Sequence, residues 1–284
     1  MVFGVSLKGK KYYRFGFLKL IFHFCFSLCT LLALTNISLY AQNDQYKYVI
    51  THNDSLALEK VIVENYYVSD SSDYNDSTKN SLPKGSITYR IFIDMKPGYN
   101  LQLVYGSPTH ELFIETTTKF YNDVNTDALT GFNVDYKKLS NGNTALDSWI
   151  TMGAAARGLT GIPRSEDTNG LSFITNRTSL KQSDGLCKAV LPDFQLYNLS
   201  LNFFNDTSNA VRFATNDGGW AAPGGVKGPS PENRVLIAQL TTNGKLSFEL
   251  NVQIGTPNGG WVKFVAKNPL GSEIQFNGLN YKQL

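Results

Sequence analysis

Hydrophobic and polar residues alternate with a period of two along most of the chain after residue 42. This is the pattern of half-buried β-strands, and no stretch of ten or more residues shows a convincing helical period. The segment 87–94 is a clear example, and the turn residues Pro97-Gly98 follow it. Segments 100–105 and 111–118 predict the next two strands.

Two segments near the C-terminus predict a β-hairpin. They span 234–242 and 245–254, and Asn243-Gly244 between them suits the positive φ angles of a type I′ turn. In the second segment every other residue from Leu246 to Ile254 is apolar, so one face is predicted to belong to the core. The first segment is apolar on both faces, which predicts a central strand.

The spacing of strands and turns predicts the fold class. Many short strands with turn residues every 8 to 12 residues or so are typical of an all-β fold, here an antiparallel β-sandwich or jelly roll. Polar segments over 69–85, 120–146 and 156–185 predict long loops, where function usually lies. We expect one domain over 42–284, with two stacked sandwiches as the alternative.

The first 41 residues predict a secretory signal peptide. Five basic residues precede an apolar run over 20–34, and the segment 38–41 (SLYA) places the small residue Ala41 before Gln42. The alternative is a membrane anchor, but the run has only 15 residues and contains His23, whereas a spanning helix needs roughly 20 apolar residues. We therefore expect export to the envelope or beyond, with no transmembrane segment after cleavage.

Cleavage changes the charge of the protein. The full chain has 26 basic and 23 acidic residues, and loss of residues 1–41 removes five basic residues and no acidic one. The remaining 21 basic residues give a net charge of −2. We expect no nucleic-acid partner, because phosphate contacts need clustered lysine and arginine. The one cysteine that remains, Cys187, is predicted to be a buried apolar side chain.

Acidic residues suggest two kinds of site. Asp70, Asp73 and Asp76 crowd one loop and offer hard oxygen ligands for calcium, although their spacing matches no EF-hand and a solvated acidic loop is the alternative. Glu111 and Glu115 are four residues apart, which places them on one face of a strand. With Asp147 from elsewhere in the chain they suggest the carboxylate pair of a glycoside hydrolase.

The three tryptophans, Trp149, Trp220 and Trp261, are the remaining candidates for a ligand site. The last two follow the similar turns NDGG and NGG. An indole beside a flexible polar turn can present a flat face on which a sugar ring stacks, as in carbohydrate-binding sandwiches. The alternative is that each tryptophan closes one end of the core.

Several short segments of the chain resemble an uncharacterised secreted domain of Bacteroidota. They are 61–70 (VIVENYYVSD), 82–90 (LPKGSITYR), 95–99 (MKPGY), 110–112 (HEL), 146–149 (LDSW), 165–167 (SED) and 232–239 (ENRVLIAQ). Such domains often accompany immunoglobulin-like repeats and a type IX secretion sorting tail, and the sequence up to Leu284 shows neither. The resemblance implies export and a β fold, and it carries no known activity to any residue.

These observations favour a non-catalytic function. The chain is rich in tyrosine and asparagine, poor in histidine, and without a recognised catalytic spacing. We expect an exported binding or scaffolding domain whose partner is a polysaccharide or an envelope protein, with calcium as the one cofactor to consider. The alternatives are a secreted carbohydrate-active hydrolase or lyase, and a purely structural module of a surface assembly.

Overall fold

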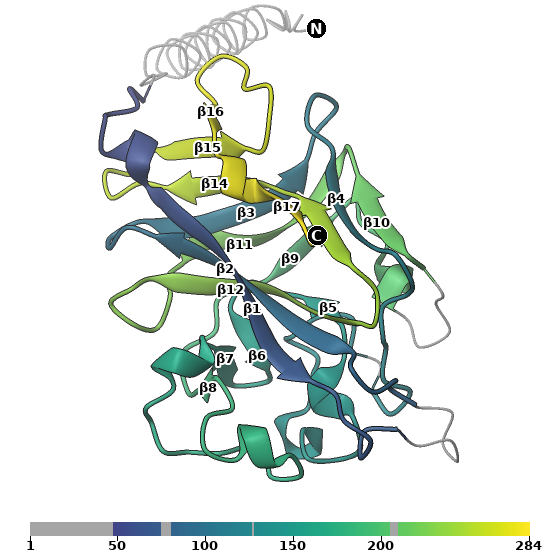
Figure 1. The fold of residues 1–284 in the computed structure, drawn as a ribbon. Coiled ribbons are helices and arrows are strands. Elements are labelled where there is room, and N and C mark those ends of the chain that lie inside the picture. Colours follow the sequence, from purple (N-terminus) through teal and green to yellow (C-terminus); the bar gives the residue numbers. More distant parts are fainter. Residues whose placement is uncertain (1–47, 75–80, 127, 205–209) are drawn as a thin grey trace, which may run out of the picture. The chain divides into compact units, whose positions relative to one another are not determined.

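The computed structural model describes residues 48–74, 81–126, 128–204 and 210–284. Residues 50–284 form one compact unit of β-strands and short 3-10 turns (Figure 1). Its sheets are antiparallel apart from one parallel pair, so the predicted all-β, sandwich-like fold is confirmed. The signal peptide predicted over 1–41 lies outside the described residues.

The described residues of this unit form four sheets, and we name each by its position. The central sheet has the order β1 (Leu58–Val68), β2 (Ile87–Met95), β12 (Arg234–Thr242) and β5 (Trp149–Ile150). The side sheet has the order β10 (Arg212–Thr215), β4 (Leu112–Thr116), β13 (Leu246–Glu249) and β17 (Asn280–Lys282). The outer sheet has the order β16 (Ile274–Gln275), β15 (Trp261–Val265), β14 (Asn251–Gly255), β3 (Asn100–Gly106), β11 (Gly218–Val226) and β9 (Gln195–Tyr197). The small sheet has the order β6 (Ala154–Ala156), β7 (Leu159–Gly161) and β8 (Leu186–Cys187).

The central sheet separates two hydrophobic cores. Ile91 and Ile237 belong to the sandwich core, which the central, side and outer sheets enclose. Phe92 and Leu236 point the other way, into a loop-side core with the small sheet and the long loops. This explains why the segment 234–242 is apolar on both faces, and it confirms the prediction of a central strand.

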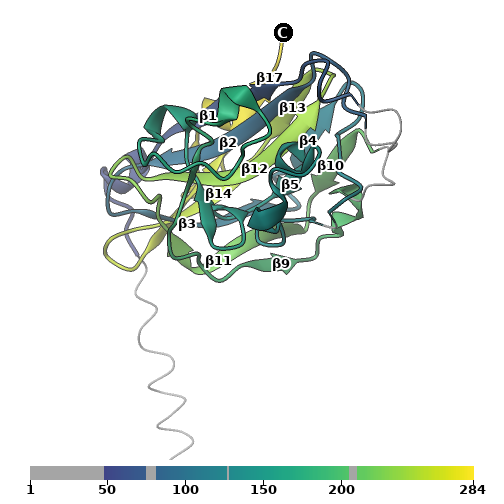
Figure 2. The same cartoon turned by 90° about the horizontal axis from the view of Figure 1, so that it is seen from below.

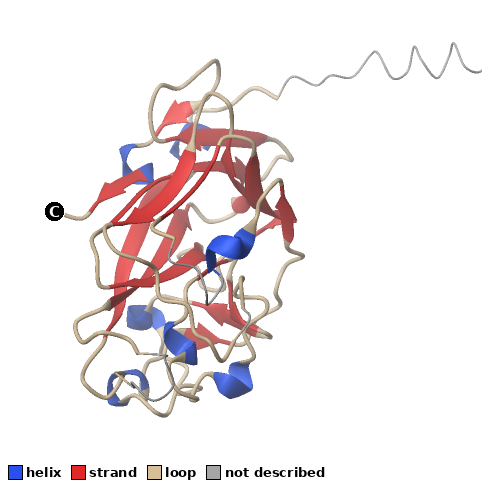
Figure 3. Ribbon diagram, turned by 90° about the vertical axis from the view of Figure 1, so that its right-hand side faces the viewer, coloured by secondary structure: helices blue, strands red, loops and turns tan. Residues whose placement is uncertain are grey.

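Figure 2 shows the loop-rich side, with short turns in front of β2 and β12. Most of the secondary structure there consists of single 3-10 turns joined by loops (Figure 3). The turns of this region are η3 (Tyr136–Lys138), η4 (Thr144–Leu146), η5 (Arg164–Glu166) and η6 (Thr178–Leu180). The other 3-10 turns in the described ranges are η1 (Asp54–Leu56), η7 (Leu201–Phe204) and η8 (Asn277–Leu279).

Buried polar contacts hold these loops where regular secondary structure is sparse. Arg177 Nε lies 3.2 Å from Asp73 Oδ1, and both side chains are less than 5% exposed. Arg90 stacks over the ring of Tyr66, 3.6 Å from its centroid, and donates to the carbonyl oxygen of Gly185 at 2.9 Å. Arg177 also donates to the carbonyl oxygen of Gly142 at 2.8 Å, so each guanidinium ties a strand or loop to a distant backbone segment.

The hairpin predicted at Asn243-Gly244 is wrong. β12 pairs with β2 and β5, whereas β13 pairs with β4 and β17, so the chain crosses from the central to the side sheet at this point. Neither residue has a positive φ angle. The crossing is held instead by Thr242, whose hydroxyl contacts that of Thr116 at 2.7 Å. A Cβ on Gly244 would lie only 2.6 Å from the hydroxyl oxygens of Thr116 and Thr118.

The segment 245–254 is also divided between two sheets. Leu250 separates β13 in the side sheet from β14 in the outer sheet. The predicted apolar face is nonetheless buried from Leu246 to Ile254, because both halves face the same sandwich core. Strands that bend from one sheet into another in this way make the corners of a sandwich.

No helix among the described residues has the length and apolar character needed to cross a membrane.

Candidate functional site

The structure separates the three tryptophans predicted to bind a ligand. Trp149 is 1% exposed in the loop-side core, and Trp220 is 0% exposed in the sandwich core, where its Nε1–H donates to the carbonyl oxygen of Thr151. Trp261 is 48% exposed. Stacking on a ligand from solution needs an accessible ring, so the prediction fails for the two buried indoles and remains open for Trp261.

Strand register explains why two similar turns lead to opposite environments. Trp220 pairs with Val104, in a row of the outer sheet that faces the sandwich core. Trp261 pairs with Gly255, one residue out of phase with the core-facing Val262. Because side chains alternate between the two faces of a strand, Trp261 points to the solvent face of the same sheet.

Two glycines make room for amide side chains on the surface beside Trp261. Gly255 lies opposite Trp261 on β14, and a Cβ there would be 2.3 Å from Gln102 Nε2 and 2.5 Å from Asn100 Oδ1. A Cβ on Gly225 would be 1.8 Å from the same Asn100 oxygen. A larger residue at either position would displace these amides. The two glycines therefore allow the amide groups to lie close to the indole.

A β-bulge supplies one of these amides. Gln102 is the extra residue of β3 where the pairing with β14 shifts register, and its Oε1 accepts from Gln253 Nε2 at 2.9 Å. Asn100 Oδ1 is buried without a hydrogen-bond partner in the described part of the chain. The edge of the sheet near Trp261 therefore offers amide donors and acceptors beside an accessible aromatic ring.

Lys263 adds a positive charge next to the indole. Its Nζ lies 5.5 Å from the Trp261 ring centroid and 5.3 Å from that of Tyr105, so the ammonium sits between two aromatic rings. The Tyr105 hydroxyl is buried without a described partner, and burial raises the pKa of Tyr105 above its ordinary value. We call Trp261, Lys263, Gln253 and Gln102 the outer strip.

The same face continues across the outer sheet towards its far edge. The register places Lys263, Gln253 and Leu103 in one row, and the row continues through Ala221 to Gln195 on β9. Four strand spacings of about 4.8 Å make this row roughly 19 Å long. Tyr197, 40% exposed, stands at the β9 edge.

The predicted calcium ligands have different environments. Asp73 is buried, and its carboxylate accepts from the Tyr67 hydroxyl at 2.9 Å and pairs with Arg177. Asp70 is exposed and accepts from the backbone and hydroxyl of Ser72. Asp76 lies outside the described residues. No group of three or more acidic, histidine or cysteine side chains placed to hold a metal occurs within the described ranges.

The acidic residues of the hydrolase hypothesis do not share a cleft. Glu111 and Glu115 are on one face, as predicted, and Arg212 bridges them at 2.7 and 3.4 Å. Asp147 is 1% exposed in the protein interior, and its Oδ1 accepts from the backbone of Asp123 and Ser148. Burial raises the pKa of Asp147 well above 3.8, whereas Glu111 and Glu115 are exposed beside Arg212.

Of the outer-strip residues, the sequence singled out Trp261 alone. Gln102, Gln253 and Lys263 lie in three strands, and each is an unremarkable polar residue of an alternating pattern. The pairing of β14 with β15 and with β3 brings them together. Among family models, curated proteins and solved structures, no comparison finds a match to this chain.

Proposed function

We propose that this chain is an exported, non-catalytic binding domain that holds a polysaccharide at the bacterial envelope, with the outer strip as its contact surface. The observation that carries the proposal is the half-exposed indole of Trp261 beside Lys263 and a set of amide groups. Export follows from the predicted signal peptide, and the bacterial setting from the resemblance described above.

The chemistry of the strip suits a sugar polymer. The C–H face of a pyranose packs on an indole, while its hydroxyls need donors and acceptors such as those of Gln102 and Gln253. The row of residues is long enough for several linked rings, and Gly255 lets the amide of Gln102 lie close to Trp261. A partner protein is the alternative occupant, and a glycan panel separates the two.

The test is binding of the purified protein to a panel of polysaccharides. Trp261→Ala should weaken binding roughly tenfold or more, equivalent to about 1.4 kcal/mol, because it removes the stacking surface. Trp261→Phe keeps an aromatic ring and should lose less. Leu171→Ala is the matched control, because that side chain is 49% exposed on a distant loop. Unchanged binding in Trp261→Ala, or no glycan ligand at all, would overturn the proposal and favour a protein partner.

The panel is measured with calcium and again with a chelator. The Arg177 guanidinium already balances the charge of Asp73, so we expect glycan binding to be insensitive to the chelator. Loss of binding on chelation would instead support the hypothesis of a calcium site near Asp70.

A further inference from the structure

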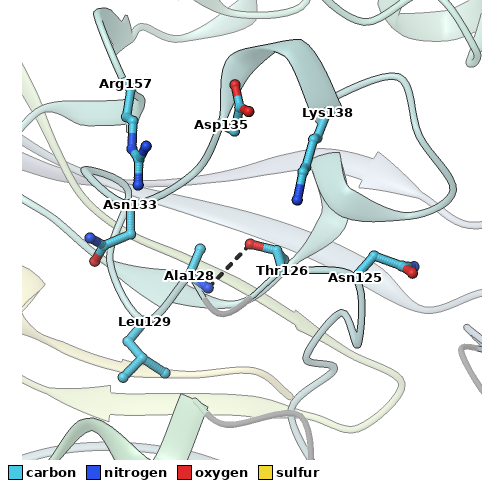
Figure 4. A pocket seen from close by; sticks show the side chains of 8 residues that line it. All are labelled: Asn125, Thr126, Ala128, Leu129, Asn133, Asp135, Lys138 and Arg157. Atoms are coloured by element: carbon cyan, nitrogen blue, oxygen red, sulfur yellow. Dashed lines mark hydrogen bonds between the residues drawn. The ribbon is translucent and has the colours of Figure 1, made fainter.

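A cavity of about 450 Å³ lies between the loop 125–133 and η3, on the loop-rich side of the unit (Figure 4). Its lining residues Thr126 and Ala128 flank residue 127, which lies outside the described residues. We therefore assign no ligand to this cavity.

The central sheet has a long edge strand, β1, which runs along the front of the unit in Figure 1. β1 has 11 residues, whereas the other edge strands in the described ranges have two to four. Its only strand partner in the described part of the chain is β2. A long edge of this kind is a template for pairing with another strand, and proteins usually shorten or cover such edges.

Two irregularities limit the part of β1 that can pair with a further strand. The register with β2 shifts at both ends of the segment 60–65. Beyond the second shift, Arg164 Nη1 donates to the carbonyl oxygen of Tyr66 at 2.9 Å and closes the edge there. Between the shifts, residues 60–65 make no backbone hydrogen bond to a segment other than β2 within the described ranges. This segment is therefore left with an unpaired backbone edge.

The apolar side chains of this segment pack on both faces of the sheet. Val61 and Val63 contact the sandwich core, and Ile62 contacts the loop-side core. All three are nonetheless partly exposed, because no further strand covers their outer side in the part of the chain described. Cross-strand pairs of β-branched residues stabilise a sheet. An added strand would therefore bury more apolar surface on both faces at once.

Opposite charges flank these apolar residues. Lys60 is exposed and Glu64 is partly buried, and neither belongs to an ion pair within the described ranges. Glu64 Oε1 accepts from the backbone of Arg164 at 2.8 Å, whereas its Oε2 is buried without a hydrogen-bond partner among the described residues. Burial raises the pKa of Glu64, so a cation placed beside it would stabilise its charged form.

The segment 60–64 (KVIVE) is complementary to itself in an antiparallel arrangement. Pairing centred on Ile62 places Lys60 of each copy opposite Glu64 of the other. Side chains directly opposite each other in an antiparallel pair have Cβ atoms about 5 Å apart, which is within reach of an ion pair. The pairing therefore brings together two opposite-charge pairs on either side of an apolar centre.

The charges also select this register over its neighbours. A shift by one residue would place Glu59 opposite Glu64 in one direction, and Lys60 opposite Asn65 in the other. The first arrangement sets like charges against each other, and the second leaves both charges of the segment unpaired. Either shift would also turn the core-facing sides of the two copies in opposite directions.

We propose that this chain forms a two-fold symmetric dimer, in which residues 60–64 of β1 pair antiparallel with the same segment of a second copy. The central sheets of the two copies then join into one continuous sheet. A second copy fits this edge better than an unrelated strand, because a two-fold contact uses the same self-complementary segment twice. The dimer uses none of the outer-strip residues and does not rest on glycan binding.

The test is sedimentation of the purified protein over a range of concentrations. The unaltered protein should show a concentration-dependent dimer. Lys60→Glu places two glutamates opposite each other at both charged pairs, so it should raise the dimer dissociation constant roughly tenfold or more. Lys245→Glu is the matched control, because it makes the same change of charge at an exposed position between β12 and β13.

A mixture of two variants separates the proposed pairing from a loss of fold. Glu64→Lys alone places two lysines opposite each other, so it should dimerise as poorly as Lys60→Glu does. Mixed together, the two variants restore an opposite charge at both pairs and should form a heterodimer. If the lysine prevents folding, Glu64→Gln takes its place, since the amide oxygen can still accept from Arg164 and the mixture keeps one opposite-charge pair.

Three results would overturn the proposal. They are a monomer at all concentrations up to about 100 μM, a Lys60→Glu variant that dimerises as the unaltered protein does, and mixed variants that stay monomeric. Trp261→Ala should dimerise normally, so the dimer and the outer strip can fail separately.

Discussion

At the scale of single residues, burial decides what each tryptophan can do. Trp220 and Trp261 follow similar glycine turns, yet one is fully buried and the other half-exposed. The sequence motif was enough to identify both as notable. It could not assign their faces, because the face depends on strand register, which the motif does not encode.

Phenylalanine at the two positions should therefore have unequal effects on stability. Trp220→Phe removes buried volume and leaves the Thr151 carbonyl oxygen without its indole donor, which we expect to lower the free energy of unfolding by about 2–4 kcal/mol. Trp261→Phe should change it by about 0.5 kcal/mol or less. Urea denaturation of the two variants measures both values. Similar losses would mean that the Trp261 ring is also part of the core.

Asp147 gives a prediction for pH dependence. Its folded-state pKa is raised, mainly by burial, so above its ordinary value of 3.8 the unfolded chain gives up this proton more readily than the folded protein. The stability contributed by this group is complete below that pH. It is lost as pH rises towards the folded pKa, at up to about 1.4 kcal/mol per pH unit.

Asp147→Asn should remove this contribution. The asparagine keeps an oxygen to accept from the backbone of Asp123 and Ser148, and it carries no proton that titrates in this range. Between pH 4 and 7 the free energy of unfolding of the variant should rise relative to that of the unaltered protein. Parallel curves for the two proteins would contradict the prediction. Asp193→Asn, at an exposed position, is the control.

At the scale of elements, the sequence predicted strands far better than their partners. Alternation located β2 and β3, and an apolar run located β12, because burying one or both faces of a strand leaves a local pattern. The Asn-Gly pair predicted a hairpin, but the choice between a hairpin and a sheet crossing depends on distant residues. Here the hydroxyls of residues 116–118 lie next to Gly244. The sequence around Asn243 does not predict this long-range approach.

A double-mutant cycle tests this crossing. Gly244→Ala places a Cβ against the hydroxyl of Thr118, so it should cost about 1–3 kcal/mol of stability. Thr118→Ala removes that hydroxyl, and the glycine substitution should cost at least about 0.5 kcal/mol less in this background. Additive effects would mean that the two positions are apart, as an isolated hairpin requires. Gly259→Ala is the control for backbone strain alone, since Gly259 has a φ of 81° and no atom within 4 Å of a Cβ.

At the scale of the whole molecule, the central sheet joins the two cores. Neighbouring residues of β2 face opposite ways: Ile91 belongs to the sandwich core and Phe92 to the loop-side core. β12 does the same with Ile237 and Leu236. Loss of this sheet would expose apolar side chains of both cores. The loop-rich side therefore depends on the sandwich, despite its sparse secondary structure.

Unfolding of residues 50–284 should consequently be one cooperative transition. Phe92→Ala removes a ring from the loop-side core alone, at a cost of about 3–5 kcal/mol, yet it should lower the urea midpoint of both cores equally. Pulsed hydrogen exchange of peptides covering β7 and β14 reports the two sides separately. If β7 lost protection at a lower urea concentration than β14, or if Phe92→Ala moved only the β7 midpoint, the cores would be energetically separate. Coincident midpoints in both proteins would make the apolar residues of β2 and β12 the link that turns two cores into one folding unit.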